Sequence, residues 1–334
     1  MNTTLLIKDV KQKEMIDKME DLFGDGSLYS LNFNCDYKLD EMLKHDISSP
    51  IPMLMTASKL LDLHPIPASM VPSLGCSCFL CHDSDGHILV GRNYDIKHEM
   101  TGILMTSKDQ KDTIESLGLV DLGWFGYVKG DLSDGKHDNS VCIFSPYMPV
   151  EGMNKEGLVI AVLQLMSEGP HQETGKKKSN TTFMIRHVLD RAHNVAEAIE
   201  IFASRDMHSM RDGFDYHFFI ADKSGRSVVI EYVKNEMNIV ETDRVTNFYL
   251  SDPTSELRVG KERYDIIDAV LKYRGGRLEM NEVLEVLKLI SQPSGCDTGR
   301  SNTRWSVVYD LTDLSAEIYT DHCYDRPHKI SFEE

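Results

Sequence analysis

Cys76 is the residue of this 334-residue chain whose surroundings most favour chemistry. It follows Gly75 and opens a β-prone run, and a second β-prone run ends in the stretch Gly91–Asp95. The residues between them, Asp83–Gly86, are typical of a tight hairpin turn. Folding the hairpin about Ser84-Asp85 predicts that Cys76 pairs with Asn93 or Tyr94, with Arg92 and Asp95 at its flanks.

A thiol beside these two side chains points to nucleophilic catalysis. Arg92 is permanently charged and favours thiolate over thiol, while Asp95 is expected to orient Arg92 and to hold an ammonium group. An ammonium partner suggests an N-terminal nucleophile. If the Gly75–Cys76 bond were cut, the new α-amino group, with an ordinary pKa of about 7.7–8.0, would activate its own thiol. Glycine before the cysteine leaves the carbonyl unshielded against attack by the thiol.

Four motifs, in this order, resemble those of the N-terminal-nucleophile amidohydrolases. The branch is that of choloylglycine hydrolase, penicillin V acylase and the isopenicillin-N acyltransferase group, with acid ceramidase as a distant relative. The resemblance runs from Cys76 to near the C-terminus and implies a four-layer αββα sandwich of two antiparallel sheets. The motifs are Cys76-Ser77-Cys78-Phe79, Gly91–Asp95, Gly152–Leu158 and Val245-Thr246-Asn247.

The resemblance also implies roles for residues outside the hairpin. Asn247 stands where the family uses an amide donor to hold a developing oxyanion. Gln164 stands where bile-salt hydrolases carry Asn and penicillin V acylases carry Tyr, which puts substrate choice in doubt, since the contact expected there is a backbone N–H. Arg263 is the best match for a second arginine. The candidate catalytic residues are therefore Cys76, Arg92, Asp95, Gln164, Asn247 and Arg263.

We expect a cysteine amidohydrolase that cleaves linear, non-peptide amide C–N bonds of an N-acyl substrate. N-acyl amino acids, conjugated bile salts and penicillin-like compounds are the candidate substrates. If an amine replaces water in the second half-reaction, the same site is an acyltransferase. No cofactor is expected.

Two other readings of the cysteine-rich strand are less favoured. Cys76, Cys78 and Cys81 are ligand types of a zinc or iron–sulfur site, but Cys81 should face away from the other two on a strand, and no second cluster completes the set. A histidine could be the base of a thiol hydrolase, yet none of the 13 histidines is marked out by its surroundings.

Composition limits the partners. The net charge of −17 argues against nucleic acid and anionic membrane surfaces, and no run approaches the roughly 20 apolar residues of a membrane span. The first residues lack the pattern of a signal peptide, and seven cysteines, an odd number, read as reduced thiols of a cytoplasmic protein. We expect a small-molecule partner and a homo-oligomer.

The chain divides into residues 1–75 and a catalytic domain, 76–334. The first part predicts helices over 8–23 and 53–63, then a proline-broken approach to Gly75 (Pro65, Pro67, Pro72). It is either a prosegment or cap over the site, or a helical extension that is never removed.

The catalytic domain is expected to be α+β. Residues 96–150 read as loop-rich, with apolar side chains around Trp124 and Tyr147 that either line an acyl cleft or pack the core, and 170–180 reads as a polar, mobile loop. The remaining elements are a strand over 158–165, helices over 181–191 and 195–204 with Asn194 as N-cap, a hairpin over 216–232, helices over 256–273 and 279–291, and strands over 305–311 and 315–320.

Overall fold

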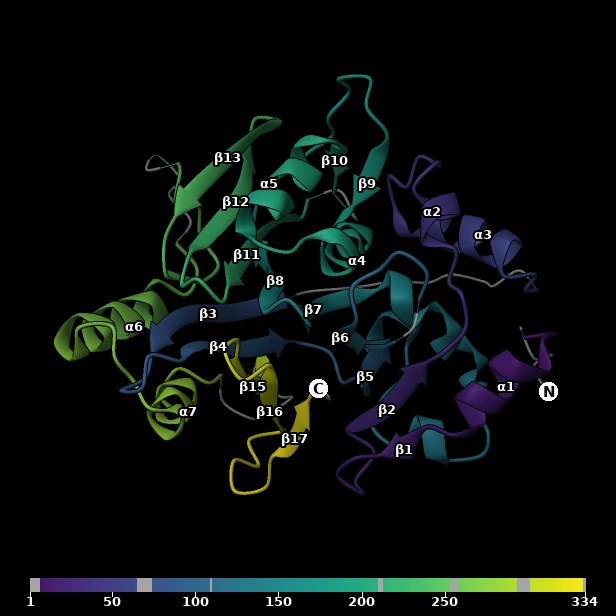
Figure 1. Ribbon diagram of the computed structural model, residues 1–334, viewed down its shortest axis with the longest axis horizontal. Coiled ribbons are helices and arrows are strands. Elements are labelled where there is room, and N and C mark those ends of the chain that lie inside the picture. Colours follow the sequence, from purple (N-terminus) through teal and green to yellow (C-terminus); the bar gives the residue numbers. More distant parts are fainter. Residues whose placement is uncertain are drawn as a thin grey trace.

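Two β-sheets face each other, and helices cover the outer face of each (Figure 1). The computed structural model describes residues 7–64, 74–108, 110–209, 213–252, 254, 258–292 and 301–332. Helices α4 and α5 pack on the first sheet, and α6 and α7 pack on the second. The expected four-layer αββα sandwich is therefore confirmed.

The first sheet has nine strands in the order β1-β2-β5-β6-β7-β8-β11-β12-β13. Neighbouring strands run antiparallel except β2 and β5, which are parallel. The bounds are β1 Glu20–Asp21, β2 Leu28–Phe33, β5 Gly102–Ser107, β6 Ser116–Asp121, β7 Pro149–Asn154, β8 Leu158–Leu165, β11 Asp215–Asp222, β12 Ser227–Val233 and β13 Glu236–Glu241.

The second sheet has six antiparallel strands in the order β14-β3-β4-β15-β16-β17. A separate parallel pair joins β9 (Lys178–Asn180) to β10 (Asp206–His208). The strands of the second sheet are β3 Leu74–His82, β4 Ile88–Ile96, β14 Arg244–Val245, β15 Asn302–Asp310, β16 Ser315–Thr320 and β17 His328–Ser331.

Two helices of the outer layers, α4 and α5, begin at asparagine caps. The side chain of Asn180 caps α4 and that of Asn194 caps α5, as expected for Asn194. A glycine in the left-handed region ends α6, where only a residue without Cβ adopts positive φ easily. The helices are α1 Val10–Asp17, α2 Leu39–Met42, α3 Pro50–Leu60, α4 Thr181–Arg191, α5 Val195–Ala203, α6 Lys261–Arg274 and α7 Met280–Leu289, with 3₁₀ turns at Leu122–Phe125, Asp131–Ser133 and Asn139–Tyr147.

The hairpin that contains Cys76 has the expected register. β3 and β4 pair antiparallel with Cys76 opposite Tyr94 and Cys78 opposite Arg92. The Asp83 side chain stabilises the turn between them, because it accepts hydrogen bonds from the backbone N–H groups of Asp85 and His87. Local turn chemistry therefore fixes which residues of β4 lie beside the thiol.

Residues 96–150 are loop-rich, as expected, but they also contain strands that the sequence analysis did not predict. This segment provides β5, β6 and the start of β7 in the middle of the first sheet. Glycines in these strands weaken the strand pattern in the sequence, yet the packing requires at least one of them. A Cβ added at Gly152 would lie 2.3 Å from the carbonyl oxygen of Leu117, so the two strands approach too closely for a side chain.

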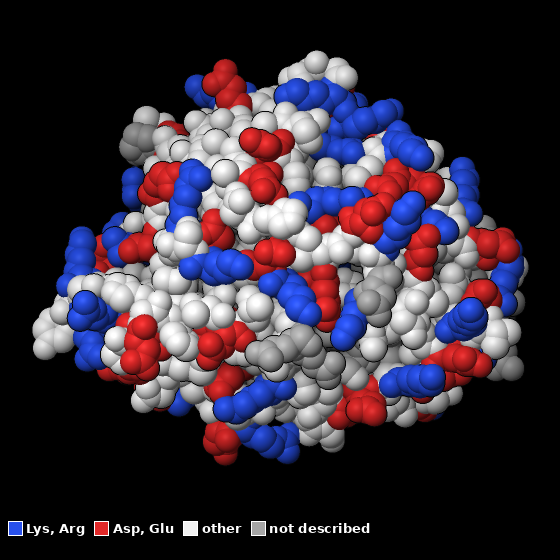
Figure 2. Space-filling view, in the orientation of Figure 1, with Lys and Arg blue, Asp and Glu red and all other residues white. Residues whose placement is uncertain are grey.

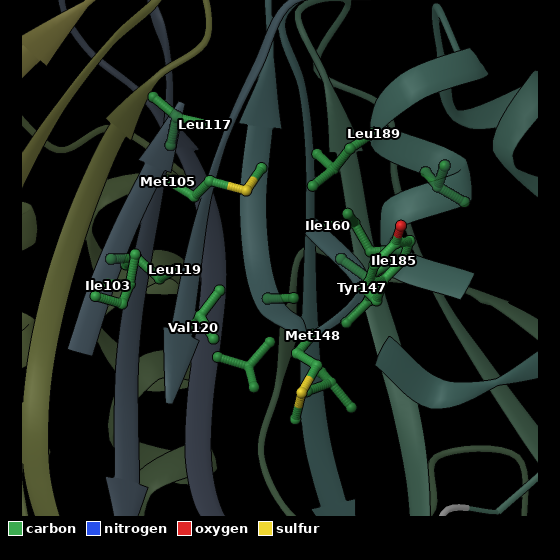
Figure 3. Close-up of a cluster of buried hydrophobic side chains, with 14 of the residues drawn as sticks. Ile103, Met105, Leu117, Leu119, Val120, Tyr147, Met148, Ile160, Ile185 and Leu189 are labelled. Atoms are coloured by element: carbon green, nitrogen blue, oxygen red, sulfur yellow. The ribbon is translucent and has the colours of Figure 1, made fainter. Parts of the chain in front are cut away.

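Apolar side chains of this segment fill the core rather than an open cleft. Ile103, Met105, Tyr147 and Met148 are fully buried, and Figure 3 shows them packed with side chains of β6, β8 and α4. Trp124 is buried as well. Of the two readings of this segment, the structure supports core packing.

The N-terminal part is not only helical. Its first helix is shorter than expected, and the chain then forms β2, which pairs along its whole length with β5. The side chains of Leu28, Leu31 and Phe33 are buried in the core. The proline-containing approach to Gly75, over residues 65–73, lies outside the described residues.

The chain has a net charge of −17. On the face in Figure 2, acidic side chains are interspersed with basic ones. Basic side chains also gather at the upper edge of this face. The lysines of the 170–180 segment have local partners, since Lys178 binds Glu173 and Lys176 binds the carbonyl oxygen of Ala203. Among the described residues, none of the helices combines the length and apolarity needed to cross a bilayer.

Candidate active site

Cys76 lies near the start of β3, fully buried, on the face that looks toward the first sheet. Cys78 and Tyr94 share this face, whereas Phe79 and Cys81 pack against α6 and α7 on the other side of the strand. The alternation of side chains along a strand separates Cys81 from the other two thiols. The geometry therefore argues against the three-thiol metal site.

Other groupings of ligand-type side chains also leave out these cysteines. Within the described part of the chain, the two clusters that could hold an ion are His87, Asp310 and Asp313, and Asp131, Asp134 and His137. The six cysteines there are all free, and Cys296 lies outside the described residues.

Asn247 and Arg263 hold the main chain of Cys76. The backbone N–H of Cys76 donates to Oδ1 of Asn247 at 2.8 Å, and Nη1 of Arg263 donates to the Cys76 carbonyl oxygen at 2.7 Å. Arg263 also donates from Nη2 to Oδ1 of Asn247, at 2.8 Å. The structure thus brings together three of the candidate residues, and the acceptor that faces the Cys76 nitrogen would also accept from a free α-amino group.

Local pairing explains the position of Asn247. β14 pairs with β3 so that Val245 lies opposite Cys78, and continuing this antiparallel register by two residues places Asn247 opposite Cys76. Arg263 comes from the first turn of α6, 16 residues after Asn247. Its side chain lies on the outer face of β3, where it also donates to the Ser77 hydroxyl at 3.2 Å.

Asp95 does not orient Arg92, contrary to our expectation. It accepts from Nη1 of Arg263 at 3.1 Å and from the Thr303 hydroxyl at 2.6 Å. Residues three apart on a strand point to opposite faces, so Asp95 and Arg92 lie on different sides of β4. Asp95 therefore supports the arginine that binds the Cys76 main chain, rather than the arginine beside the thiol.

Arg92 bridges the two sheets next to the thiol. Its Nη2 donates to the carbonyl oxygen of Val162 in β8 at 2.7 Å, and its Nε lies 3.4 Å from Oε1 of Glu151. Glu151 is fully buried and also accepts from Trp305 and Tyr309. The sequence analysis missed Glu151, although an acidic residue within the apolar run at 149–153 is a signal that could have found it.

Burial weakens the acidity of the thiol in the continuous chain. Removal from water raises the pKa of Cys76 above its usual value, and the positive charge of Arg92 only partly offsets this effect. Burial likewise raises the pKa of Asp95, with Arg263 as the main opposing charge. Arg92 favours the thiolate as expected, but burial outweighs its effect on the pKa of Cys76 in the chain before any cut.

Gln164 contributes its backbone rather than its side chain. Its carbonyl oxygen accepts from Nδ2 of Asn247 at 2.9 Å. The Gln164 side chain shares a face of β8 with Ile160, which packs against α4 (Figure 3), so it points away from Cys76. The N–H and C=O of one strand residue point the same way, so the Gln164 N–H is directed toward the Asn247 side.

A second acidic group, Asp215, lies beside the segment that carries Asn247. The Tyr249 hydroxyl donates to the Asp215 carboxylate, and the Oγ of Ser167 lies 2.7 Å from the Tyr249 hydroxyl oxygen. Burial raises the pKa of Asp215 to about 7, against hydrogen bonds from Tyr249 and the Tyr216 backbone that lower it.

This raised pKa predicts a pH-dependent stability. Asp215 ionises near pH 3.9 in the unfolded chain but only near 7 in the folded one, so its contribution is present below about pH 4 and is lost as pH rises through about 7. We expect the wild-type free energy of unfolding, minus that of Asp215→Asn, to fall by a few kcal/mol between pH 4 and 8. Urea titrations at stepped pH measure this, and a pH-independent difference would contradict the assignment.

Two solved structures of the same bacterial enzyme are similar to this chain. Variants of the conjugated bile acid hydrolase from Clostridium perfringens match with TM-scores of 0.54 and 0.55 at 18% and 16% sequence identity, covering 77% of this chain and 92% of theirs. A comparison of the sequence with curated proteins finds no match. The fold is accordingly that of the N-terminal-nucleophile hydrolases.

The sequence adds the family. Residues 76–254, more than half of the chain, match the model of the linear amide C–N hydrolases, choloylglycine hydrolase family, and the chain belongs to this family. It is thus a hydrolase that acts on linear amide bonds. The match begins at Cys76 and includes Asn247, whereas Arg263 lies beyond it.

Proposed function

We propose that Cys76 is the nucleophile of a cysteine amidohydrolase that cleaves the amide bond of an N-acyl small molecule. The observation that carries the proposal is the contact of Asn247 and Arg263 with the backbone nitrogen and carbonyl of Cys76. A nucleophile that supplies its own base must have its amino nitrogen fixed, and these contacts fix that nitrogen.

In the proposed reaction, the Cys76 α-amine takes the proton of the thiol, and the sulfur attacks the substrate carbonyl carbon. The second Nδ2 hydrogen of Asn247 and the Gln164 N–H stabilise the tetrahedral oxyanion. As the intermediate collapses, the C–N bond breaks and the ammonium returns its proton to the leaving amine. Water then attacks the thioester, which releases the acid and restores the thiol. Arg92 stays beside the sulfur as a fixed positive charge.

Activation requires a cut before Cys76. In the proposed maturation, the thiol attacks the Gly75 carbonyl, the C–N bond of the peptide breaks, and the Cys76 nitrogen leaves as an amine. Water hydrolyses the resulting thioester to the Gly75 carboxylate and a free thiol. The space around Gly75 is crowded, because a Cβ at this position would lie 3.0 Å from the Ser301 hydroxyl oxygen. A residue without a side chain therefore suits the position before the bond that is cut. Residues 1–75 are then a prosegment, and 76–334 the catalytic chain.

Intact-mass analysis and a substrate panel test the proposal together. The panel contains glycocholate, penicillin V and N-dodecanoylglycine. We expect masses for 1–75 and 76–334 and release of the free amine from at least one panel compound. Adding an acceptor amine separates the alternatives, because an acyltransferase forms a new amide where a hydrolase forms the acid. A fully active intact chain would contradict the N-terminal-amine mechanism.

We predict that the prosegment stays bound after the cut. β2 is an inner strand of the first sheet, and burying each of its large apolar side chains contributes about 1.5–3 kcal/mol. The Tyr147 hydroxyl donates to the carbonyl oxygen of Tyr37, and the Ile47 N–H donates to the carbonyl oxygen of Lys178. Native mass spectrometry should record both chains in one particle, and denaturing conditions should separate them.

A variant in β2 provides the control for this prediction. Phe33→Asp places a charge in the core between the two chains and should release the prosegment or prevent folding. Fully active 76–334 without bound prosegment would contradict the prediction.

A further inference from the structure

A buried His–Glu pair of the first sheet makes hydrogen bonds to the segment that contains Asn247. His217 of β11 and Glu231 of β12 are fully buried, and the register in which Phe218 pairs with Ile230 places them opposite each other. Nδ1 of His217 lies 3.2 Å from Oε2 of Glu231. The pair faces the space between the sheets, on the opposite side of β11 from Phe218, which packs on Phe202 of α5.

Both members of the pair also bind the 246–251 segment. Nε2 of His217 donates to the carbonyl oxygen of Thr246 at 2.7 Å. The carboxylate of Glu231 accepts the backbone N–H groups of Leu250, at 3.2 Å, and of Ser251. The two ends of the segment are thus held by one buried group of side chains, and Asn247 lies between them.

The hydrogen bonds assign the roles of the two ring nitrogens of His217. A carbonyl oxygen only accepts, so Nε2 carries a hydrogen. The other nitrogen, Nδ1, faces the carboxylate of Glu231. Burial raises the pKa of Glu231, but hydrogen bonds from His217 and Ser251 outweigh burial and lower it below its usual value.

The contact with Thr246 acts directly on Asn247. The Thr246 carbonyl and the Asn247 nitrogen belong to one planar peptide unit, so fixing the carbonyl oxygen fixes the plane from which the Asn247 side chain projects. Thr246 is held a second time by its hydroxyl, which donates to the Gly260 carbonyl at 3.0 Å. The Asn247 side chain, in turn, contacts the Cys76 nitrogen.

We propose that His217 and Glu231 are positioning residues of the amide hydrolysis, acting through Thr246 on the Asn247 side chain that holds the Cys76 amino group. The inference rests on the proposed function of Cys76. Neither residue touches the thiol, and their effect is on the rate of the chemical step rather than on substrate binding.

Three variants at His217 and Glu231 test the inference. His217→Leu removes both hydrogen bonds, His217→Gln keeps one donor for Thr246, and Glu231→Gln removes the charge. Because a displacement of about 1 Å at a reacting group costs about 10²-fold, we expect His217→Leu to lower kcat by that factor with KM nearly unchanged. His217→Gln should retain more activity than His217→Leu. Kinetics use the panel compound that wild type turns over fastest.

A double variant separates positioning from a general structural role. If His217 acts through Asn247, His217→Leu combined with Asn247→Ala should be no slower than Asn247→Ala alone. Asp190→Asn is the matched control, since it breaks the equally buried Arg186–Asp190 pair of α4. It should lower the urea midpoint but leave kcat of the folded protein at the wild-type value.

The outcomes distinguish the inference from the proposed function. Additive losses in the double variant, or wild-type kcat in folded His217→Leu, would overturn the inference while Cys76→Ala remains inactive. Activity in Cys76→Ala would overturn the proposed function itself. Loss of kcat in His217→Leu without further loss in the double variant would support the positioning role.

Discussion

Replacing Cys76 by alanine should leave a single uncut chain without measurable amide hydrolysis. The proposed mechanism uses the sulfur twice, first on the Gly75 carbonyl and then on the substrate, and alanine supports neither attack. The protein should remain folded, because removing one buried sulfur costs about 1 kcal/mol or a little more. Intact mass, thermal unfolding and panel turnover measure the three consequences in one preparation.

Cys78→Ala is the matched control for this variant. Cys78 is equally buried, lies on the same face of β3 two residues further along, and also lies close to Arg92. Its alanine variant should lose similar stability but be cut and remain active. If Cys76→Ala kept more than a few per cent of wild-type turnover, Cys76 would not be the nucleophile.

The sequence predicted the parts of the site that depend on local structure. The hairpin turn at Asp83–Gly86 determined the partners of Cys76 in β4, and the register in the structure agrees. The assignment of Asn247, in contrast, came from the family resemblance, and the structure has this residue two positions after β14. Turn chemistry and strand alternation act over a few residues and can therefore be inferred from a single chain.

Partners that come from distant segments could not be predicted in the same way. Asp95 was assigned to Arg92 because the two are close in sequence. In the structure, the Asp95 side chain lies on the outer face of β4, where it contacts Arg263. Arg263 belongs to α6, which packs on the outer side of β3. Glu151 reaches Arg92 across the space between the sheets. Such pairs depend on how the layers pack, which neither spacing nor composition specifies.

The structure of the N-terminal part, residues 1–75, was also only partly predictable from the sequence. The strand β2 pairs in parallel with β5, about 70 residues later in the chain. A short strand with a long-range partner has little local signal, whereas the charged helix before it has a strong one. The sequence therefore suggested a helical cap where the structure has a strand within the sheet.

Asp95→Asn should lower kcat/KM by about 10²–10⁴-fold, the usual cost of losing a positioned charged group at an active site. In the structure Asp95 holds Arg263, and Arg263 binds both the Cys76 carbonyl and Asn247. Without the carboxylate, the guanidinium loses its buried ionic partner and keeps only the exposed Glu262, whose Oε1 lies 3.9 Å from Nε. Breaking such a pair typically costs about 3–5 kcal/mol of stability, so the variant should also unfold at lower urea.

A second substitution separates the two effects. Arg263→Met in the Asp95→Asn background removes the stranded charge and should restore part of the stability, because an apolar side chain replaces an unpaired ion. It should not restore the rate, since the donor to the Cys76 carbonyl is then absent. Near-normal kinetics in Asp95→Asn would show that Asp95 has no role in catalysis. Recovery of kcat/KM in the double variant would show that the rate depends on removing an unpaired charge, and not on the contact between Arg263 and the main chain of Cys76.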